Sequence, residues 1–180
     1  MRRTAALIMA LALLYLPACG MDGGGAARVW QLELSGETAA FAEMMPGEDA
    51  AAFGYEARGA QGLEAAAYAC EGGEWRKTSL LLEFASAPEE GMMVLSFDCV
   101  ASGFGITLLD IDGRSQTMRT ASAAVPGECS ARAYASDAEG GDIALCVEYY
   151  GECPADIGHY AHPETIPDGI KAYALVIRFK

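Results

Sequence analysis

The densest group of side chains able to ligate a metal lies in the segment CPADIGHYAHPE. It holds the chain's only two histidines, His159 and His162, together with Cys153, Asp156 and Glu164. On a helix the two histidines would share one face at i and i+3 and could both reach a metal ion. Three prolines in and just after the segment keep any helix short, and zinc also needs well-placed third and fourth ligands. The pattern therefore favours a polar connection between the last two strands, without a metal site.

A second acidic motif, Asp110-Ile111-Asp112-Gly113, has the spacing with which a calcium loop begins. An EF-hand loop needs oxygen ligands at positions 1, 3 and 5 and glycine at position 6. Here Arg114 occupies position 5 and the glycine comes at position 4, so the match fails. Asp-Gly between two extended segments predicts instead a type I′ hairpin turn, in which both central residues have positive φ.

Catalytic motifs are missing from the sequence. It has no G-x-S-x-G elbow, no H-E-x-x-H pair and no glycine loop of the phosphate-binding kind. Carboxylates are plentiful, but an acidic chain places them on any solvated face, and no spacing singles out the facing pair that a glycosidase needs. We therefore expect no catalytic residues, no cofactor and a non-enzymatic binding or interaction role. The alternative is an exported hydrolase or a metal-binding protein.

Aromatic side chains offer another possible site, a stacking platform for sugars. Packing in the core is the competing interpretation, since Trp75 begins a predicted strand and Tyr173 lies on the apolar face of another. Tyr149 and Tyr150 are adjacent, so they point to opposite faces of a strand and one of them is expected to face outward. A glycan partner and a protein partner both stay open. The candidate platform residues are Trp30, Trp75, Tyr149, Tyr150, Tyr160 and Tyr173.

Strands must position these side chains, because alternating apolar residues and frequent turn signals dominate the chain. A short helix or an irregular connection is expected over Thr38–Met45, ended by Pro46-Gly47, and no long amphipathic helix appears. A hairpin loop is expected over residues 136–142. The pattern predicts an all-β fold, an antiparallel β-sandwich of about eight strands. The residues expected to share one face are Met93, Leu95, Phe97 and Cys99 in one strand, and Tyr173, Leu175, Ile177 and Phe179, facing inward, in another.

The N-terminal stretch predicts where the protein is located. Arg2 and Arg3 precede the twelve-residue apolar run Ala5–Leu16, which is shorter than the roughly 20 residues a spanning helix requires. The run instead has the length and flanks of a signal peptide. Leu16-Pro17-Ala18-Cys19 then resembles the lipobox of bacterial lipoproteins. That resemblance implies cleavage before Cys19 and a diacylglyceryl group on its sulfur, and two acyl chains suffice for stable anchoring in a bilayer.

Three parts of the chain follow from this interpretation: residues 1–18 as the signal peptide, 19–27 as the lipidated cysteine and glycine-rich tether, and 28–180 as one domain. We expect the protein at the cell membrane, lipid-anchored and facing the extracytoplasmic side. Cleavage leaves 162 of the 180 residues and removes two arginines, so the net charge changes from −13 to −15. Such a charge disfavours nucleic acid and anionic lipid headgroups as partners.

Five cysteines remain if Cys19 is lipidated, so at least one thiol is left unpaired or bonds to another molecule. In a simple meander, Cys70 and Cys99 would end strands about 9 to 10 Å apart, beyond the usual disulfide range, unless those strands lie in facing sheets. Cys146 is expected on the face opposite Ile143, Leu145 and Val147. The five are Cys70, Cys99, Cys129, Cys146 and Cys153.

Three segments of the chain, FGYEARGAQGLEAAAYACEGGEW, DIALCVEY and AYALVIRF, resemble a group of small lipoproteins of anaerobic Gram-positive bacteria. The shared pattern is an aromatic-Gly-Tyr-Glu entry to a strand, a Gly-Glu-Trp turn, and a last strand of alternating aromatic residues. The resemblance implies an exported β-rich domain over most of residues 28–180. It transfers no activity and no functional residue to this chain.

Overall fold

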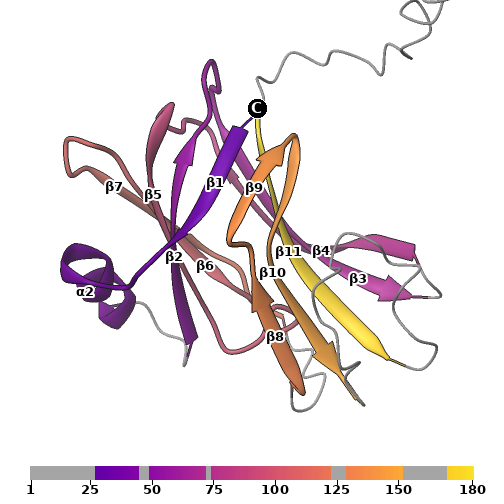
Figure 1. Ribbon diagram of the computed structural model, residues 1–180. Coiled ribbons are helices and arrows are strands. Elements are labelled where there is room, and N and C mark those ends of the chain that lie inside the picture. Colours follow the sequence, from indigo (N-terminus) through magenta and orange to yellow (C-terminus); the bar gives the residue numbers. More distant parts are fainter. Residues whose placement is uncertain (1–26, 45–48, 72–73, 123–128, 152–169) are drawn as a thin grey trace, which may run out of the picture.

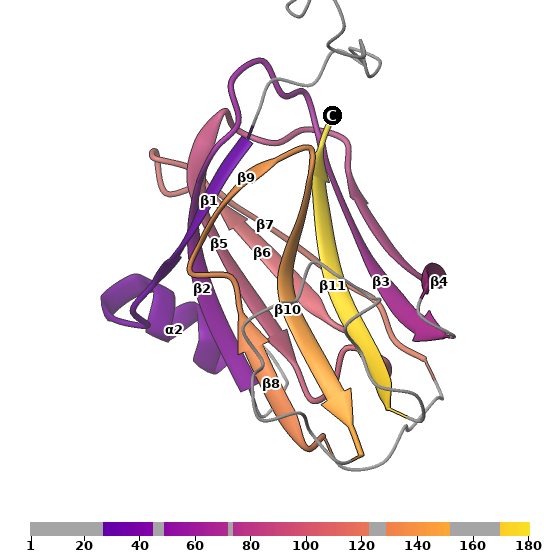
Figure 2. The same ribbon diagram turned by 45° about the vertical axis from the view of Figure 1, so that its right-hand side comes forward.

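Two antiparallel sheets pack face to face in the computed structural model, which describes residues 27–44, 49–71, 74–122, 129–151 and 170–180 (Figure 1; Figure 2). Sheet A has the strand order β7-β6-β5-β2-β1-β9, with bounds β1 Ala27–Leu32, β2 Asp49–Glu56, β5 Glu90–Phe97, β6 Gly105–Leu109, β7 Ser115–Arg119 and β9 Asp137–Gly140. Sheet B has the order β4-β3-β11-β10-β8, with bounds β3 Leu63–Glu71, β4 Glu74–Phe84, β8 Ala131–Tyr134, β10 Asp142–Tyr150 and β11 Lys171–Phe179. The predicted all-β sandwich is confirmed, with eleven described strands instead of about eight.

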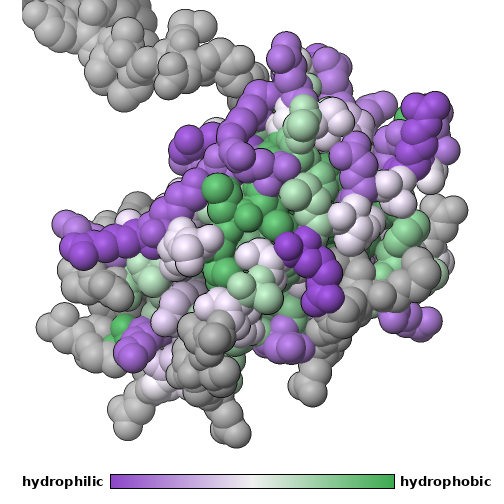
Figure 3. All heavy atoms as spheres, turned by 180° about the vertical axis from the view of Figure 1, so that it is seen from behind, coloured by the Kyte–Doolittle hydropathy of each residue, from purple (hydrophilic) through white to green (hydrophobic). Residues whose placement is uncertain are grey.

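The core lies between the sheets and is built from alternate residues of their strands, as the period of two in a strand requires. Met93, Leu95 and Phe97 of β5 face Leu175 and Ile177 of β11 across this core, which confirms both predicted alternations. Cys99, which was expected to continue the β5 pattern, lies beyond the end of the strand. Polar side chains border an apolar area near the centre of the surface seen from behind (Figure 3).

A β-bulge in β10 changes which face its cysteine occupies. The register of β10 with β11 shifts between Ala144 and Cys146, so an extra residue enters β10 at this point. Leu145 and Cys146 consequently both join the core beside Ile143, whereas Val147 belongs to the outer face. The prediction that Cys146 lies opposite Ile143 and Leu145 is therefore wrong, because simple alternation stops at a bulge.

The turn between β6 and β7 forms where Asp-Gly predicts it, but not with the expected geometry. The amide of Gly113 donates to the carbonyl of Asp110 at 3.1 Å, and the amide of Asp110 donates to the carbonyl of Arg114 at 3.0 Å. Gly113 has φ +77°, whereas no described residue other than glycine has positive φ. The turn thus has glycine as its single left-handed residue, as in a type I turn with a bulge, and the type I′ prediction is wrong.

The segment between β8 and β10 is not a simple hairpin loop. β8 pairs antiparallel with β10 as predicted, but residues 137–140 of the connection form β9, which pairs with β1 in the other sheet. The side chain of Arg28 on β1 forms a two-pronged ion pair with Asp137 on β9, with distances of 3.1 and 2.8 Å. Because β9 covers the edge of β1, that edge is not left open for pairing with another chain.

The helix α2 (Gly36–Met44) lies on the outer face of sheet A, close to the predicted range (Figure 1; Figure 2). Phe41 and Ala42 pack on Val94 and Leu109, which point outward from β5 and β6. The helix therefore covers the part of this face around Val94 and Leu109 and does not extend over the whole face. Within the described ranges, no helix has both the length and the apolar character to cross a bilayer.

Four of the five fold cysteines lie in the described part of the chain: Cys70, Cys99, Cys129 and Cys146. Of these, Cys99, Cys129 and Cys146 have free thiols. β3, which ends near Cys70, and β5, which precedes Cys99, belong to different sheets. The simple meander considered for these two strands is therefore not the topology. Cys153 and the histidine-containing segment lie outside the described residues.

Glu64 on β3 and Glu83 on β4 are direct cross-strand partners, and a lysine neutralises them. The ammonium of Lys180 lies 2.8 Å from Glu64 and 2.7 Å from Glu83, and Lys77 adds a contact of 2.5 Å to Glu64. Hydrogen bonds from Lys180 and Lys77 lower the pKa of Glu64 from 4.5 to about 2. The pair of like charges is thus tolerated because cations lie between and beside its members.

Acid titration should report on this cluster. A carboxyl group whose pKa falls on folding stabilises the folded state above its unfolded pKa, and this contribution disappears as the pH drops through the folded pKa. Between pH 4.5 and 2, the wild-type melting temperature should therefore fall more than that of Glu64→Gln, as measured by circular dichroism. Glu33→Gln, at an exposed position outside the cluster, should follow the wild-type curve. Parallel curves for wild type and Glu64→Gln would contradict the assignment.

Candidate functional site

The predicted aromatic platform does not exist as one surface. Trp30 lies on the outer face of sheet A, whereas Trp75 packs against the outer face of sheet B. Tyr150 and Tyr173 contact each other edge to face, with ring centroids 5.5 Å apart, and Tyr173 packs against the core. Tyr149 lies on the opposite face from Tyr150, as predicted, but both are buried and neither is an exposed aromatic. Tyr160 lies outside the described residues.

A buried carboxylate, Glu148, first suggests a catalytic acid. Its side chain is fully buried, yet each oxygen accepts two hydrogen bonds. Nε and Nη2 of Arg132 donate to one oxygen at 2.9 and 2.7 Å, and the amide of Val100 and the hydroxyl of Tyr150 donate to the other at 2.7 and 2.8 Å. A carboxylate satisfied in this way has a structural role, because all its lone pairs are engaged within the fold.

Arg132 extends this network from sheet B to sheet A. It also donates to Asp49 at the start of β2 and to the carbonyl of Asp98 after β5, and its guanidinium lies 4.6 Å from the ring centroid of Phe97. Burial lowers the pKa of Arg132, but the hydrogen bonds that Arg132 donates to Asp49 and Glu148 outweigh burial and raise the pKa above its ordinary value. The network therefore ties the two sheets together at one end of the sandwich.

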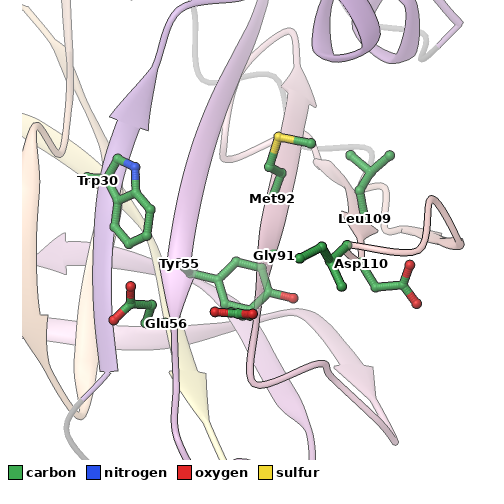
Figure 4. Close-up of a pocket in the computed structure, with 9 residues that line it drawn as sticks. Trp30, Tyr55, Glu56, Gly91, Met92, Leu109 and Asp110 are labelled. Carbon is green, nitrogen blue, oxygen red and sulfur yellow. The ribbon is translucent and has the colours of Figure 1, made fainter.

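A different site lies on the outer face of sheet A, in a pocket of about 310 Å³. One cross-strand row forms its apolar part: Trp30, Gly54, Met92 and Leu109 are successive partners on β1, β2, β5 and β6. The missing side chain at Gly54 makes room for the indole, since a Cβ there would lie 2.4 Å from the Trp30 ring. Glycine in a strand interior commonly marks such a close approach. Trp30, Met92 and Leu109 are drawn around this hollow in Figure 4.

Carboxylates form the adjoining row. Glu56 on β2 and Glu90 on β5 are direct cross-strand partners, both exposed and both lining the pocket. Like charges opposite each other destabilise a sheet. Among the described residues, neither forms an ion pair within 4.0 Å. The pKa of Arg28 is raised mainly by Asp137, against the lowering effect of burial, and Glu139 and then Glu56 add smaller contributions that raise it. Asp110 and the exposed Ile111, from the β6–β7 turn, complete this side of the pocket.

The hydroxyl of Tyr55 lies in the pocket wall without a hydrogen-bond partner. The Tyr55 side chain is fully buried and packs on Phe179 with ring centroids 5.1 Å apart, and its oxygen is the one buried side-chain polar atom lacking a partner among the described residues. The oxygen lies beside Gly91, where a Cβ would come within 3.0 Å of it, and points toward Asp110 in Figure 4. Burial, and then the charge of Asp110, raise the pKa of Tyr55, so the hydroxyl keeps its proton.

These features together describe a binding pocket. Its volume lies at the lower end of the roughly 300–1,000 Å³ typical of ligand sites, and an apolar lining with a few polar groups is the usual composition of such sites. A buried polar group without a partner costs about 1–3 kcal/mol and calls for an explanation, which a ligand can supply. Of the predicted platform residues that the structure describes, only Trp30 lines this pocket.

Sequence reasoning missed the other pocket residues. Glycine inside FGYE was a usable signal, because a strand glycine indicates a close approach of other groups. The opposition of Glu56 and Glu90 had no such signal, because it depends on how β2 and β5 are aligned. Tyr55 has the alternation of a core residue, and only its position at the strand end brings its hydroxyl to the pocket.

Comparison of the chain with protein-family models, with curated proteins and with solved structures finds no match.

Proposed function

We propose that this protein is a lipid-anchored extracytoplasmic lipoprotein that acts as a non-enzymatic binding module, with its ligand site in the Trp30 pocket. The observation that carries the binding role is the buried hydroxyl of Tyr55, which lacks a described partner in the wall of a pocket lined by an apolar row and a row of carboxylates. Glu148, the fully buried carboxylate, is already saturated by four donors and is not available to a substrate. Among the described residues, the pocket lining includes no serine, cysteine or histidine, so a Ser–His or Cys–His pair is not part of it.

The binding role can be tested without knowing the ligand. We expect fragments from a library of neutral, cationic and anionic compounds to shift the indole N–H resonance of Trp30 in ¹⁵N NMR spectra. The chain has two tryptophans, so Trp75→Phe assigns the signal. Gly54→Ala should displace the indole and weaken binding of every hit at least about tenfold, because the new Cβ would overlap the ring at 2.4 Å.

Gly141→Ala is the matched control, since a Cβ at Gly141 would meet nothing within 4 Å. It should bind the same fragments as the wild type. A library from which no compound of any charge shifts the Trp30 signal would refute the binding role.

The anchor rests on Leu16-Pro17-Ala18-Cys19 and is tested separately. Cys19→Ser removes the sulfur that would carry the acyl chains, so the protein should move from the membrane fraction to the soluble fraction of fractionated cells. Cys129→Ser, at a half-buried thiol of the folded domain, should stay with the membrane. A Cys19→Ser protein that still sediments with membranes would contradict the anchor and leave the pocket untouched.

A further inference from the structure

Among the described residues, three pairs of glutamates are direct partners across neighbouring strands: Glu64–Glu83 and Glu71–Glu74 on sheet B, and Glu56–Glu90 on sheet A. Glu64 and Glu83 on sheet B hold the ammonium of Lys180 between them at 2.8 and 2.7 Å. Glu56 and Glu90 on sheet A have the same cross-strand relation, but no described cation comes within 4.0 Å of either. The Glu64–Glu83 pair therefore shows that an ammonium group can bridge two opposed glutamates in this sandwich.

Neither of the two arginines near Glu56 and Glu90 bridges these carboxylates in the way that Lys180 bridges Glu64 and Glu83. Arg28 is the cross-strand partner of Glu56, but its guanidinium is paired with Asp137 and lies 5.7 Å from the centroid of the Trp30 ring. Arg58 lines an adjoining hollow of about 400 Å³ together with both glutamates and forms no ion pair with them. A metal ion is not indicated either, because no three acidic, histidine or cysteine side chains of the described ranges converge on a common point.

The apolar row beside the glutamates defines the rest of the ligand. Trp30, Met92 and Leu109 belong to the neighbouring cross-strand row on the same face of the sheet. Within β5, Met92 follows Glu90 by two residues. A cation bound at the glutamates would therefore have its body on apolar surface. The hydroxyl of Tyr55, beside Gly91 in the pocket wall, adds a polar group that has no partner among the described residues.

We propose that the Trp30 pocket binds an aliphatic primary ammonium group, with its nitrogen between Glu56 and Glu90 and its alkyl chain on Trp30, Met92 and Leu109. A primary ammonium has three donors and can bond both carboxylates at once, as Lys180 does on sheet B. A free alkylamine and a lysine side chain of a peptide carry the same chemistry. This inference rests on the proposed binding function and specifies its ligand.

Matched probes test the inference on the full chain, with the Trp30 indole signal as readout. n-Hexylammonium should bind about tenfold or more tightly than 1-hexanol, because charge-assisted hydrogen bonds distinguish the two compounds. The Glu56→Gln/Glu90→Gln double variant should abolish this preference and leave hexanol binding unchanged. Glu33→Gln, which removes one charge at an exposed position outside the pocket lining, should keep the preference.

The thermal stability of the unliganded Glu56→Gln/Glu90→Gln variant tests the repulsion between the two carboxylates independently of ligand binding. Removing two opposed like charges should raise the melting temperature of the unliganded double variant above that of the wild type. Arg58→Met should leave hexylammonium binding unchanged, because Arg58 forms no ion pair with either glutamate. Stronger binding by Arg58→Met would mean that Arg58 occupies the ammonium position in solution, and would overturn the assignment.

Two further probes identify the source of the ammonium. Nα-acetyl-lysine amide binding more tightly than hexylammonium would indicate a lysine side chain, and the reverse order would indicate a free amine. Nα-acetyl-norleucine amide, which lacks the ammonium, should bind weakly in either case. Equal binding of hexylammonium and hexanol, or preference for hexanoate, would overturn the ammonium inference but keep the binding function. No binding of any probe or library fragment would remove both.

Discussion

Replacing Arg132 with methionine is expected to lower the free energy of unfolding by about 3–5 kcal/mol, the usual cost of removing one partner from a buried ion pair. The carboxylate of Glu148 is completely buried, and Arg132 supplies two of its four hydrogen bonds. Methionine keeps much of the apolar contact with Phe97 but supplies no positive charge. The same substitution also releases Asp49 and the carbonyl of Asp98, so the contacts from β8 to the start of β2 and to the segment after β5 are lost.

Urea denaturation would measure this effect against a matched control. Arg28→Met breaks the two-pronged ion pair between Arg28 and Asp137, whose side chains are 51% and 53% exposed, and such surface pairs contribute little to stability. The double variant Arg132→Met/Glu148→Met should recover much of the loss, because it leaves no buried charge unpaired. If Arg132→Met were no more destabilising than Arg28→Met, the network would not be what joins the sheets at this end.

Gly103→Ala is expected to destabilise the fold by about 2–6 kcal/mol, combining backbone strain with overpacking. Gly103 lies in the turn between β5 and β6 with φ +133°, a conformation that L-residues with a side chain rarely adopt. A Cβ there would also lie 2.4 Å from the carbonyl oxygen of Thr120 and 2.7 Å from Cα of Ala121. Both contacts are with backbone atoms, which cannot turn away as a side chain can.

Gly113→Ala separates the two causes. Gly113 also has positive φ, +77°, but nothing lies within 4 Å of its hypothetical Cβ. It should therefore show the strain alone, about 1–3 kcal/mol. Thermal melts of the two variants measure the difference, which represents the clash of Gly103 with the segment after β7. Equal losses would show that this segment moves aside at little cost.

Much of the fold could be predicted because alternation has a simple physical cause. A strand between core and solvent needs apolar residues at every second position, and β5 and β11 follow that rule closely. The β6–β7 turn was equally predictable, since Gly113 supplies the positive φ that the hairpin needs. The short helix needed only a compact run of helix formers followed by Pro-Gly.

The features that escaped prediction depend on contacts between distant segments. Cys146 enters the core because of a bulge, and β9 forms because β1 offers it an edge to pair with. Neither event leaves a local pattern in the sequence. The candidate site has the same origin, because Glu56 faces Glu90 only through the alignment of β2 with β5. Trp30 was recognised as an aromatic with a possible role, whereas its neighbours were not.

The position of the pocket along β1 determines how a ligand would reach it under the proposed anchor. Trp30 lies only three residues after Ala27, where the described chain begins, so the pocket is at the end of the sandwich where β1 starts (Figure 1). Seven residues lie between Cys19 and Ala27, so a fully extended chain places these two residues at most about 28 Å apart. The pocket would then sample only a thin layer above the bilayer. Amine-bearing molecules held on the same membrane would meet it at a high effective concentration, whereas freely diffusing amines would not.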